Sequence, residues 1–396
     1  MHETLTSGKD NDKTPTPDDA FWKGIRRDQF YLDPEVTFLQ GGSVGPSPKP
    51  VVDRVVEAIR AFDSDPLKHQ PLYSPIVEES RAKLADFVGT RPERLALVQN
   101  TTMALSVFAQ GVTWKVGGEI LMSDQEYGAV NACFDYVARR HGMTVRRVHL
   151  PLEINDAQQI INVFKDGINQ NTVAMVFGHV YWSTGLVTPV KELTEIGREH
   201  GIWVVVDGAH AVSMVPLQLD KWNPHFYASS LHKWTLSPKG TGMLFVSDDA
   251  HDHVEPLILG SSAHPNPNAS RFDMMGTRDQ TPFIGLGTAL EFQNEIGWDH
   301  IRHYCRGLVN YMRERLTRIR GVRFLTPLDP ELSGFITTFT IDGANIQQIR
   351  QELWDDEKIE TVAFHVNDVP VFRISTHFYN SREEIDRLVR AIERRL

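Results

Sequence analysis

Lys233 lies in the segment "SSLHKW" (residues 229–234), between a pair of hydroxyl side chains and a tryptophan. A turn rich in glycine, "SPKGTGM", follows it and leads into the apolar run "MLFV". A lysine in this setting is either a surface residue beside a loop or a buried amine placed to take part in a reaction. The choice depends on the other reactive groups of the chain and on where the fold places them.

Asp207 is one such group, because it ends the most hydrophobic strand predicted in the chain, "IWVVVDGAH" (202–210). An unpaired carboxylate is costly to desolvate there, and a protonated pyridine nitrogen would be a natural partner. Taken alone, Asp207 is better interpreted as the cap of the following helix. Asp207 and His210 could also begin a metal site, but no third ligand with recognisable spacing follows, so we predict no metal.

Two further groups are suited to bind anions. Thr101 and Thr102 begin a predicted helix directly after a strand, where free backbone N–H groups suit either a phosphate or ordinary capping. Arg373 lies between apolar residues in the strand "VFRIS" and therefore needs a buried anionic partner. That partner is either a substrate carboxylate, bound by both arms of the guanidinium, or a carboxylate in a structural salt bridge. Tyr127 either stacks on a ring or belongs to the core.

Together these residue types are the ones that a pyridoxal phosphate enzyme needs. A lysine holds the cofactor and moves the Cα proton, and a carboxylate holds the proton on the pyridine nitrogen. A helix start with hydroxyl groups binds the phosphate, and an arginine clamps the substrate carboxylate. Lys233, Asp207, Thr101 with Thr102, and Arg373 supply these groups in turn.

The segments that must position them alternate between strand-like and helix-like patterns. Near-continuous apolar runs joined by helical crossovers predict a parallel sheet that is covered on both faces. In such a sheet, ligands bind beyond the carboxyl ends of the strands, which is where Thr101, Tyr127 and Asp207 lie. The predicted strands of this sheet are 95–100, 119–124, 144–152, 172–180, 202–210 and 226–230.

After about residue 285 the pattern changes to long helices and strands of the antiparallel type. This change predicts a second, smaller domain of the α+β class. We therefore divide the chain into a disordered tail (1–20), an N-terminal segment that packs near the small domain (21–70), a large α/β domain (71–285) and a small C-terminal α+β domain (286–396).

Charge and composition exclude several classes of protein. With 41 Lys and Arg against 51 Asp and Glu, the net charge is −10, which predicts no nucleic-acid partner and no binding to anionic membranes. The two cysteines, Cys133 and Cys305, exclude a disulfide scaffold and a cysteine-rich zinc site, and they suit a reducing cytoplasm. The polar N-terminus is expected to be neither signal peptide nor anchor, and no apolar run reaches the roughly 18 residues of a membrane helix.

The chain resembles the class V aminotransferase family of fold-type I pyridoxal phosphate enzymes and, within it, the isopenicillin N epimerase-like branch. The resemblance covers roughly residues 30 to 396. It implies a large domain with a mostly parallel sheet, a small α+β C-terminal domain, and a homodimer with shared active sites. It rests on segments that are specific in combination: "GGSVGPSP", "NTTMAL", "SDQEYGAV", "GHVYWSTGLVTPV", "VVVDGAHA", "SSLHKW", "MGTRDQTPF" and "FRISTHFYN".

The resemblance also implies a role for each residue that matches a family motif. Lys233 would bind the cofactor covalently, Asp207 would hold the pyridine nitrogen, and His210 would lie near the 3-hydroxyl group. Tyr127 would stack over the ring, and Arg373 would take the substrate α-carboxylate. The residues implied at the phosphate are Thr101, Thr102, Ser230, His232 and, across a dimer interface, Thr277. Those implied beside cofactor or substrate are Ser183 and Thr184 in the "TG" loop, and Ser43 and Val44 in the "GGSVGP" loop.

The fate of the substrate after loss of its Cα proton stays open. The resemblance ranks first an epimerase acting on an amino acid in secondary metabolism. Epimerisation needs a proton donor opposite Lys233, for which Tyr127 and His69 are candidates. A C–S β-lyase that acts on an S-substituted cysteine ranks second and needs an acid that protonates the leaving group. Transamination and decarboxylation are further variants.

A cysteine desulfurase and a catalytically silent protein are both less favoured. The cysteine desulfurases of the family use a cysteine on a loop in the C-terminal third, whereas Cys133 and Cys305 both lie in helical patterns. We therefore do not expect desulfurase activity. A silent scaffold that merely binds pyridoxal phosphate is disfavoured by the intact set of Lys233, Asp207 and Arg373.

Overall fold

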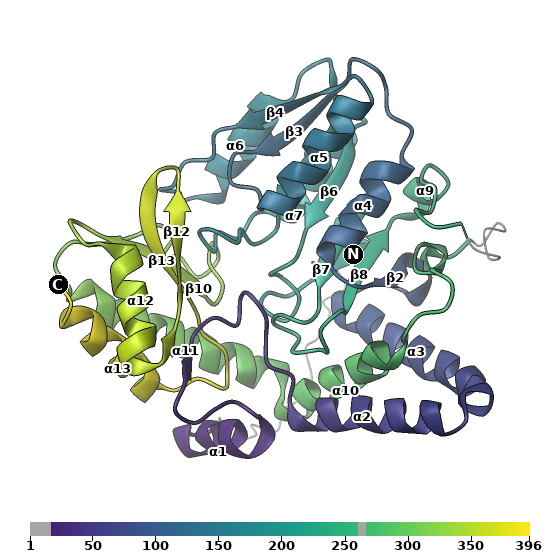
Figure 1. Cartoon of the computed structure of the whole chain (residues 1–396). Helices are drawn as coiled ribbons and strands as arrows, with labels where there is room; N and C mark the ends of the chain where they lie inside the picture. The colour runs from purple at the N-terminus through teal and green to yellow at the C-terminus, as the bar shows by residue number, and fades with distance from the viewer. Residues whose placement is uncertain (1–16, 260–266) are drawn as a thin grey trace, which may run out of the picture.

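The computed structural model describes residues 17–259 and 267–396 (Figure 1). The predicted tail lies outside the described residues up to residue 16. Helix α1 (Asp19–Gln29) begins inside the range predicted as tail, because the Asp18 side chain caps it by accepting a hydrogen bond from the Phe21 backbone N–H.

Seven strands form the larger sheet: β2 (Leu95–Val98), β3 (Glu119–Ser123), β4 (Thr144–Val148), β5 (Thr172–Gly178), β6 (Trp203–Asp207), β7 (Phe226–Ser230) and β8 (Gly242–Val246). Their order is β2-β8-β7-β6-β5-β3-β4. Only β8 runs against the others, being antiparallel to both of its neighbours. The predicted α/β fold with a mostly parallel sheet is confirmed.

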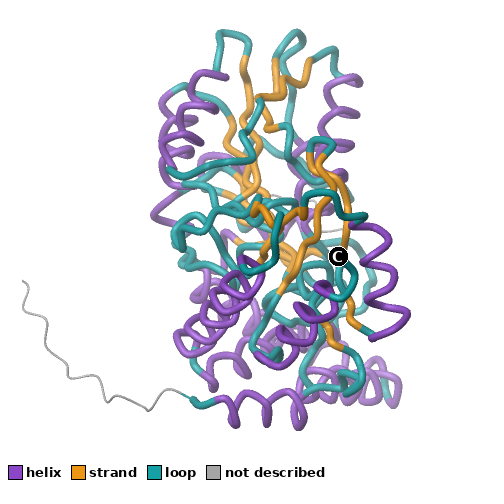
Figure 2. The backbone as a smooth tube through the Cα atoms, turned by 90° about the vertical axis from the view of Figure 1, so that its left-hand side faces the viewer, coloured by secondary structure: helices purple, strands orange, loops and turns teal. Residues whose placement is uncertain are grey.

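The apolar runs of these strands are buried on both faces. Val205 of β6 packs with one helical layer and its neighbours Val204 and Val206 with the other, as the alternation of side chains along a strand requires. Figure 2 shows helices on both sides of these strands. The first layer contains α4 (Thr101–Gly111) and α5 (Gly128–Arg140), and the second contains α6 (Ala157–Gly167), α7 (Val190–Glu199), α3 (Pro66–Val88) and α10 (Thr281–Ile296).

The C-terminal part has its own sheet with the order β12-β13-β10-β9, in which all neighbours are antiparallel. Along β13, Phe372 and Ile374 belong to the core under the helices, whereas Arg373 between them points to the opposite face. The elements are β9 (Val322–Phe324), β10 (Ile336–Ile341), β12 (Val362–Val366), β13 (Val369–Ser375), α11 (Trp298–Thr317), α12 (Ile346–Glu357) and α13 (Arg382–Glu393). The predicted small α+β domain is confirmed.

The N-terminal segment joins the two parts. Helix α1 packs on the C-terminal part, where Trp22 stacks on Tyr304 with ring centroids 4.4 Å apart. Strand β1 (Thr37–Phe38) pairs with β11 (Ile359–Glu360), and α2 (Lys49–Ser64) lies along α10 at the base of the molecule (Figure 1).

Our divisions at residues 70/71 and 285/286 pass through α3 and α10, and the domain limits stay a proposal. Among the described residues, no helix is long and apolar enough to span a membrane. The remaining elements are short: α8 (Leu219–Trp222), α9 (Asp248–His251), and two 3₁₀ turns, η1 (Pro92–Arg94) and η2 (Ala269–Phe272).

Candidate active site

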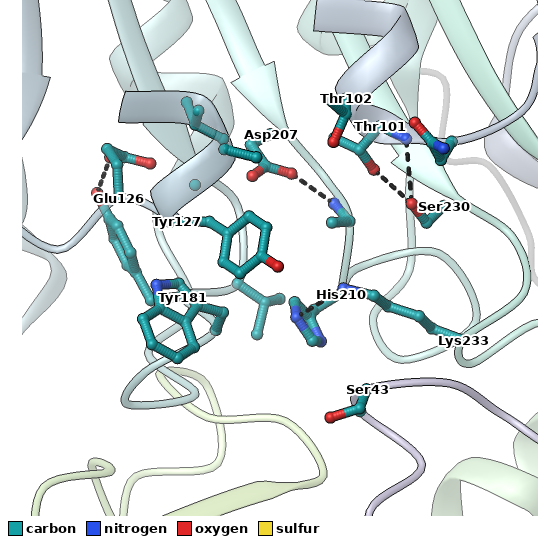
Figure 3. A pocket seen from close by; sticks show the side chains of 18 of the residues that line it. Ser43, Thr101, Thr102, Glu126, Tyr127, Tyr181, Asp207, His210, Ser230 and Lys233 are labelled. Carbon is teal, nitrogen blue, oxygen red and sulfur yellow. Dashed lines mark hydrogen bonds between the residues drawn. The ribbon is translucent and has the colours of Figure 1, made fainter. Parts of the chain in front are cut away.

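A cavity of about 400 Å³ lies at the carboxyl ends of the parallel strands, where the sequence predicts the ligand. The large sheet, the N-terminal loop and β13 of the small sheet all contribute to its wall (Figure 3). Ten of the predicted site residues line it: Ser43, Thr101, Thr102, Tyr127, Asp207, His210, Ser230, His232, Lys233 and Arg373.

Lys233 follows β7 and forms a hydrogen-bonded contact with His210, with 3.0 Å between Nζ and Nε2 (Figure 3). Trp234 Nε1 donates to His210 Nδ1 at 3.3 Å, so a neutral His210 carries its proton on Nε2 and donates it to Lys233 Nζ when the lysine is a neutral amine. Desolvation lowers the pKa of Lys233 to about 8, although Asp207 opposes this shift. Lys233 is therefore a reactive amine, and the interpretation as a surface lysine is wrong.

Asp207 ends β6 and is almost fully buried. Its Oδ1 accepts a hydrogen bond from the Ala209 backbone N–H at 2.9 Å, and no described lysine or arginine forms a salt bridge with it. Desolvation raises the pKa of Asp207 and the charge of Lys233 opposes this shift, yet no cation among the described residues pairs directly with the carboxylate. A protonated ring nitrogen in the cavity would supply that partner.

Helix α4 starts at the other end of the cavity. The Thr101 backbone N–H donates to Ser230 Oγ at 3.1 Å, and the two hydroxyl groups are 2.8 Å apart. Gly242 brings β8 against the same corner, since an added Cβ would lie 2.7 Å from both Asn100 Cα and Ser229 O. The start of α4 and the end of β7 are thus held together, and this helix start faces the cavity with its hydroxyl groups, as an anion site requires.

Arg373 is 5% exposed and has no carboxylate partner among the described residues. Nη1 donates to Trp182 O at 2.9 Å and Nη2 to Ser43 Oγ at 3.0 Å, while Nε is buried without a partner. Desolvation lowers its pKa to about 10, against the influence of Tyr127. The interpretation as a structural salt bridge is therefore wrong, and a buried cation without an anion fits an anionic ligand.

Tyr127 immediately precedes α5 and is half exposed at the cavity. Its ring meets the edge of Trp182, with centroids 5.6 Å apart and 75° between the planes. Its hydroxyl group has no hydrogen-bond partner among the described residues. Tyr127 is thus not a core residue, and its ring and hydroxyl are free to contact a ligand.

Five candidates do not line the cavity. Ser183 and Thr184 turn into the fold: Ser183 O accepts from Thr338 Oγ1 at 2.7 Å and Thr184 Oγ1 accepts from the Leu186 N–H at 3.3 Å, which fastens this loop to the small sheet. Their neighbours Tyr181 and Trp182 line the cavity instead, and the predicted role of Ser183 and Thr184 beside the cofactor stays a prediction.

Val44 lies on the surface next to Ser43, so the wall at this point is formed by Gly42 and Ser43. His69 lies in the first turns of α3 and does not reach the cavity, which is contrary to its candidacy as the second proton donor. Thr277 is exposed in the loop before α10, and its role at the phosphate of a second protomer stays a prediction.

Glu126 is a cavity residue that our interpretation of the sequence missed. Its Oε1 accepts a hydrogen bond from Tyr181 OH at 3.0 Å (Figure 3) and another from Ser123 Oγ at 2.7 Å. Desolvation is the main cause that raises its pKa to about 8, with Asp207 adding to the shift. At neutral pH Glu126 is therefore a buried carboxylic acid. The signal was a carboxylate directly before Tyr127 in a loop at a strand end.

This buried acid gives the protein a specific pH dependence. Between pH 4.5 and 8 the unfolded chain releases the Glu126 proton while the folded chain keeps it, so the folding free energy becomes less favourable as the pH rises. Glu126→Gln keeps both acceptor contacts but cannot ionise. We expect this variant to gain a few kcal/mol over wild type between pH 5 and 8, measured by urea unfolding.

The matched control is Glu153→Gln, since Glu153 is exposed before α6. Its stability should follow that of wild type across the same pH range. If Glu126→Gln does so as well, Glu126 is not the buried acid described above.

The cysteines occupy different settings. Cys305 is fully buried in α11, where burial raises its pKa far above the ordinary value. Cys133 lines the cavity from α5, and burial also raises its pKa. Neither is a thiolate on a loop, which agrees with the expectation that this chain is no desulfurase.

The residues around the cavity fit pyridoxal phosphate. The start of α4 faces the cavity with Thr102, Ser230 and His232 beside it, while His232 Nδ1 is held by Thr241 O at 3.1 Å. The buried Asp207 lacks a cation, and the buried Arg373 lacks an anion. The reactive amine of Lys233 stands between these groups. The phosphate of the cofactor would bind at the start of α4, its basic ring nitrogen would pair with Asp207, and its aldehyde would react with Lys233. The carboxylate of an amino-acid substrate would pair with Arg373.

Comparison with known proteins agrees with this fit. The Aminotransferase class-V family model matches residues 38–388. Isopenicillin N epimerase of Amycolatopsis lactamdurans is 37% identical over 387 residues, covering 93% of this chain and 97% of that protein. Isopenicillin N epimerase of Streptomyces clavuligerus is 34% identical, with coverages of 94% and 98%. A probable cysteine desulfurase of Halobacterium salinarum is 28% identical, with coverages of 94% and 95%.

Solved structures show the same fold. A mutant of C-DES with glycine covalently linked to its PLP cofactor has a TM-score of 0.82 and 22% identity, and the match covers 95% of this chain and 98% of that chain. The apo cysteine desulfurase of Thermococcus onnurineus NA1 has a TM-score of 0.83 and 23% identity, with coverages of 93% and 96%. The family match and the similarity to the two epimerases confirm the predicted resemblance: this chain belongs to the class V aminotransferase family of pyridoxal phosphate-dependent enzymes.

Proposed function

We propose that this chain is an epimerase or racemase that inverts the Cα configuration of an amino acid. The observation that supports it most is a pair of proton-carrying groups that enter the cavity from opposite sides (Figure 3). Lys233 follows β7 and Tyr127 follows β3, and in the sheet these strands lie on either side of β6 with Asp207 at its end. Inversion needs one group to take the Cα proton and another to return a proton from the opposite face.

Pyridoxal phosphate, when bound, acts as an electron sink that makes the Cα–H bond of an amino acid acidic. Lys233 is suited to take this proton, because its pKa of about 8 leaves part of the amine neutral near pH 7. His210 orients the amine, and Asp207 provides the carboxylate for the ring nitrogen. Arg373 holds the substrate by its α-carboxylate and so fixes Cα between Lys233 and Tyr127.

Tyr127 is the candidate for the second proton donor. Its hydroxyl has no protein partner among the described residues, and it is close enough to Arg373 to influence the pKa of the guanidinium. The carboxylate bound by Arg373 is one bond from Cα, and Tyr127 and Arg373 line the same cavity, so we place the Tyr127 hydroxyl on the Cα side of the bound substrate. The 37% and 34% identity to two isopenicillin N epimerases supports the same assignment.

The proposal is tested with purified holoenzyme and single amino acids in deuterated water. We expect deuterium to be incorporated at Cα and the configuration of Cα to be inverted. NMR measures the first effect and chiral chromatography the second. Formation of a 2-oxo acid without inversion would refute the epimerase assignment.

Tyr127→Phe separates the two proton transfers. Lys233 should still exchange the Cα proton with solvent, whereas inversion should slow by about 10²-fold or more, since general acid catalysis is lost on one face. The ratio of exchange to inversion in deuterated water measures this effect. Tyr136→Phe in α5, which is also half exposed but does not line the cavity, is the control. If exchange and inversion fall equally in Tyr127→Phe, Tyr127 is not the second donor.

Glu126 favours one second candidate, a C–S β-lyase. Because its pKa is about 8, Glu126 holds a proton at neutral pH that could be given to a leaving sulfur atom. A lyase would release pyruvate and a thiol from an S-substituted cysteine in the same incubation. Their appearance, and their loss in Glu126→Gln, would favour this candidate over the epimerase.

A further inference from the structure

An aromatic wall beside Arg373 has no role in the proton transfers proposed above. Trp182 and Phe364 stack with ring centroids 4.7 Å apart and 27° between their planes, and Tyr127 meets the edge of Trp182. Trp182 follows β5 of the large sheet, whereas Phe364 lies in β12 of the small sheet. Trp182 lines the cavity, and Phe364 holds its ring in place from the other domain.

This wall adjoins the carboxylate clamp. Arg373 Nη1 donates to the main-chain oxygen of Trp182 at 2.9 Å, and the guanidinium lies 5.9 Å from the centre of the Phe364 ring. Val362 is the direct neighbour of Arg373 on β12 and also lines the cavity. An amino acid held at Arg373 therefore has Trp182 and Val362 within reach of its first side-chain atoms.

The charges of the cavity restrict the substrate further. Among the described residues of this one chain, the lining contains a single lysine, Lys233, and a single arginine, Arg373. Lys233 serves the cofactor and Arg373 the α-carboxylate, so the described lining of this chain offers no further lysine or arginine for a carboxylate in the side chain. A cationic side chain would lie near Arg373 and be repelled. Glu126, which keeps its proton at neutral pH, provides no anion to compensate.

We propose that Trp182 and Val362 form the side-chain subsite and that the substrate is an amino acid whose side chain is uncharged and begins with apolar carbon or thioether atoms next to Cα. Dicarboxylic and dibasic amino acids are poor ligands of this subsite. The inference rests on the proposed function, because it takes the α-carboxylate to be bound by Arg373.

The first experiment titrates the holoenzyme with L-norleucine, L-phenylalanine, L-glutamate and L-lysine, with the absorption of the bound cofactor as the measure of binding. We expect Kd values for norleucine and phenylalanine to be at least about tenfold lower than for glutamate and lysine. Equal or tighter binding of glutamate or lysine overturns the subsite. No spectral response to any amino acid would refute the proposed function itself, so the two failures are distinguishable.

The second experiment removes the wall. Trp182→Ala keeps the main-chain oxygen that binds Arg373, so L-alanine should bind nearly as before, whereas the Kd of norleucine should rise about tenfold or more. Phe364→Ala should act in the same direction but more weakly, because Phe364 does not contact the substrate and only supports the ring of Trp182. Phe324→Ala is the control, since Phe324 packs on Phe339 in the small sheet away from the cavity. An equal loss of alanine and norleucine binding in Trp182→Ala contradicts the proposal.

Discussion

Lys233→Ala should abolish the absorption band of the covalently held cofactor and reduce turnover by about 10⁴-fold. Lys233 provides the sole lysine amine in the cavity lining of the described chain, so no neighbour can replace it either as the attachment point or as the proton carrier. Both functions depend on one nitrogen, 3.0 Å from His210 Nε2. Absorbance of the purified protein and deuterium exchange at Cα measure the two losses separately.

The fold should tolerate this change. Lys233 faces a cavity, and its lowered pKa shows that the folded protein disfavours the charged amine, so truncation removes an unfavourable charge. Lys239→Ala, on the exposed turn that follows, is the matched control and should keep band and activity. A Lys233→Ala variant that retains the covalent band would show that another amine carries the cofactor.

Arg373→Ala should raise the KM for α-amino acids by about 10²- to 10³-fold, because a substrate carboxylate loses two charge-assisted hydrogen bonds. Arg373→Lys should recover only part of this loss, since an ammonium group lacks the planar fork of the guanidinium. Amino acid amides, which have no α-carboxylate, should be affected much less. Initial rates with an amino acid and its amide provide the measurement.

The melting temperature separates this role from a structural one. Arg373 has no carboxylate partner among the described residues, so its removal costs the fold only the hydrogen bonds to Trp182 O and Ser43 Oγ, and the melting temperature should fall by no more than a few degrees. Arg323→Ala in β9, the far strand of the same sheet, removes a surface ion pair with Asp342 and is the control for activity. A large drop in melting temperature with an unchanged KM would mean that Arg373 serves the fold and not the substrate.

The parts of the site that lie on one sheet edge could be predicted from the sequence. Asp207, Thr101 and Lys233 all follow apolar strands, and the carboxyl ends of parallel strands converge. Alternation along "VFRIS" likewise predicts a buried Arg373 that faces away from Phe372 and Ile374. These inferences use only local periodicity and one rule of topology.

The rest depends on how distant segments pack. No local pattern brings Phe364 to Trp182, since their contact is set by the docking of the small sheet on the large domain. Ser183 and Thr184 lie in a matching motif, but Ser183 O accepts a hydrogen bond from Thr338 of the small sheet, and the neighbours Tyr181 and Trp182 line the cavity instead. Glu126 could not be identified from the sequence for another reason. A carboxylate in a loop is usually solvated and ionised, and only burial keeps Glu126 protonated at neutral pH.

The glycine at the start of β8 also has a consequence for how this scaffold can evolve. Gly242 brings the main chain of β8 close to Asn100 and Ser229. The shape of the proposed phosphate site is therefore set by backbone atoms, which side-chain substitutions elsewhere leave in place. The aromatic wall, by contrast, consists of side chains from two domains. Substitutions at Trp182 or Phe364 during evolution can therefore change which amino acids bind, while the backbone contacts of the cofactor site stay the same.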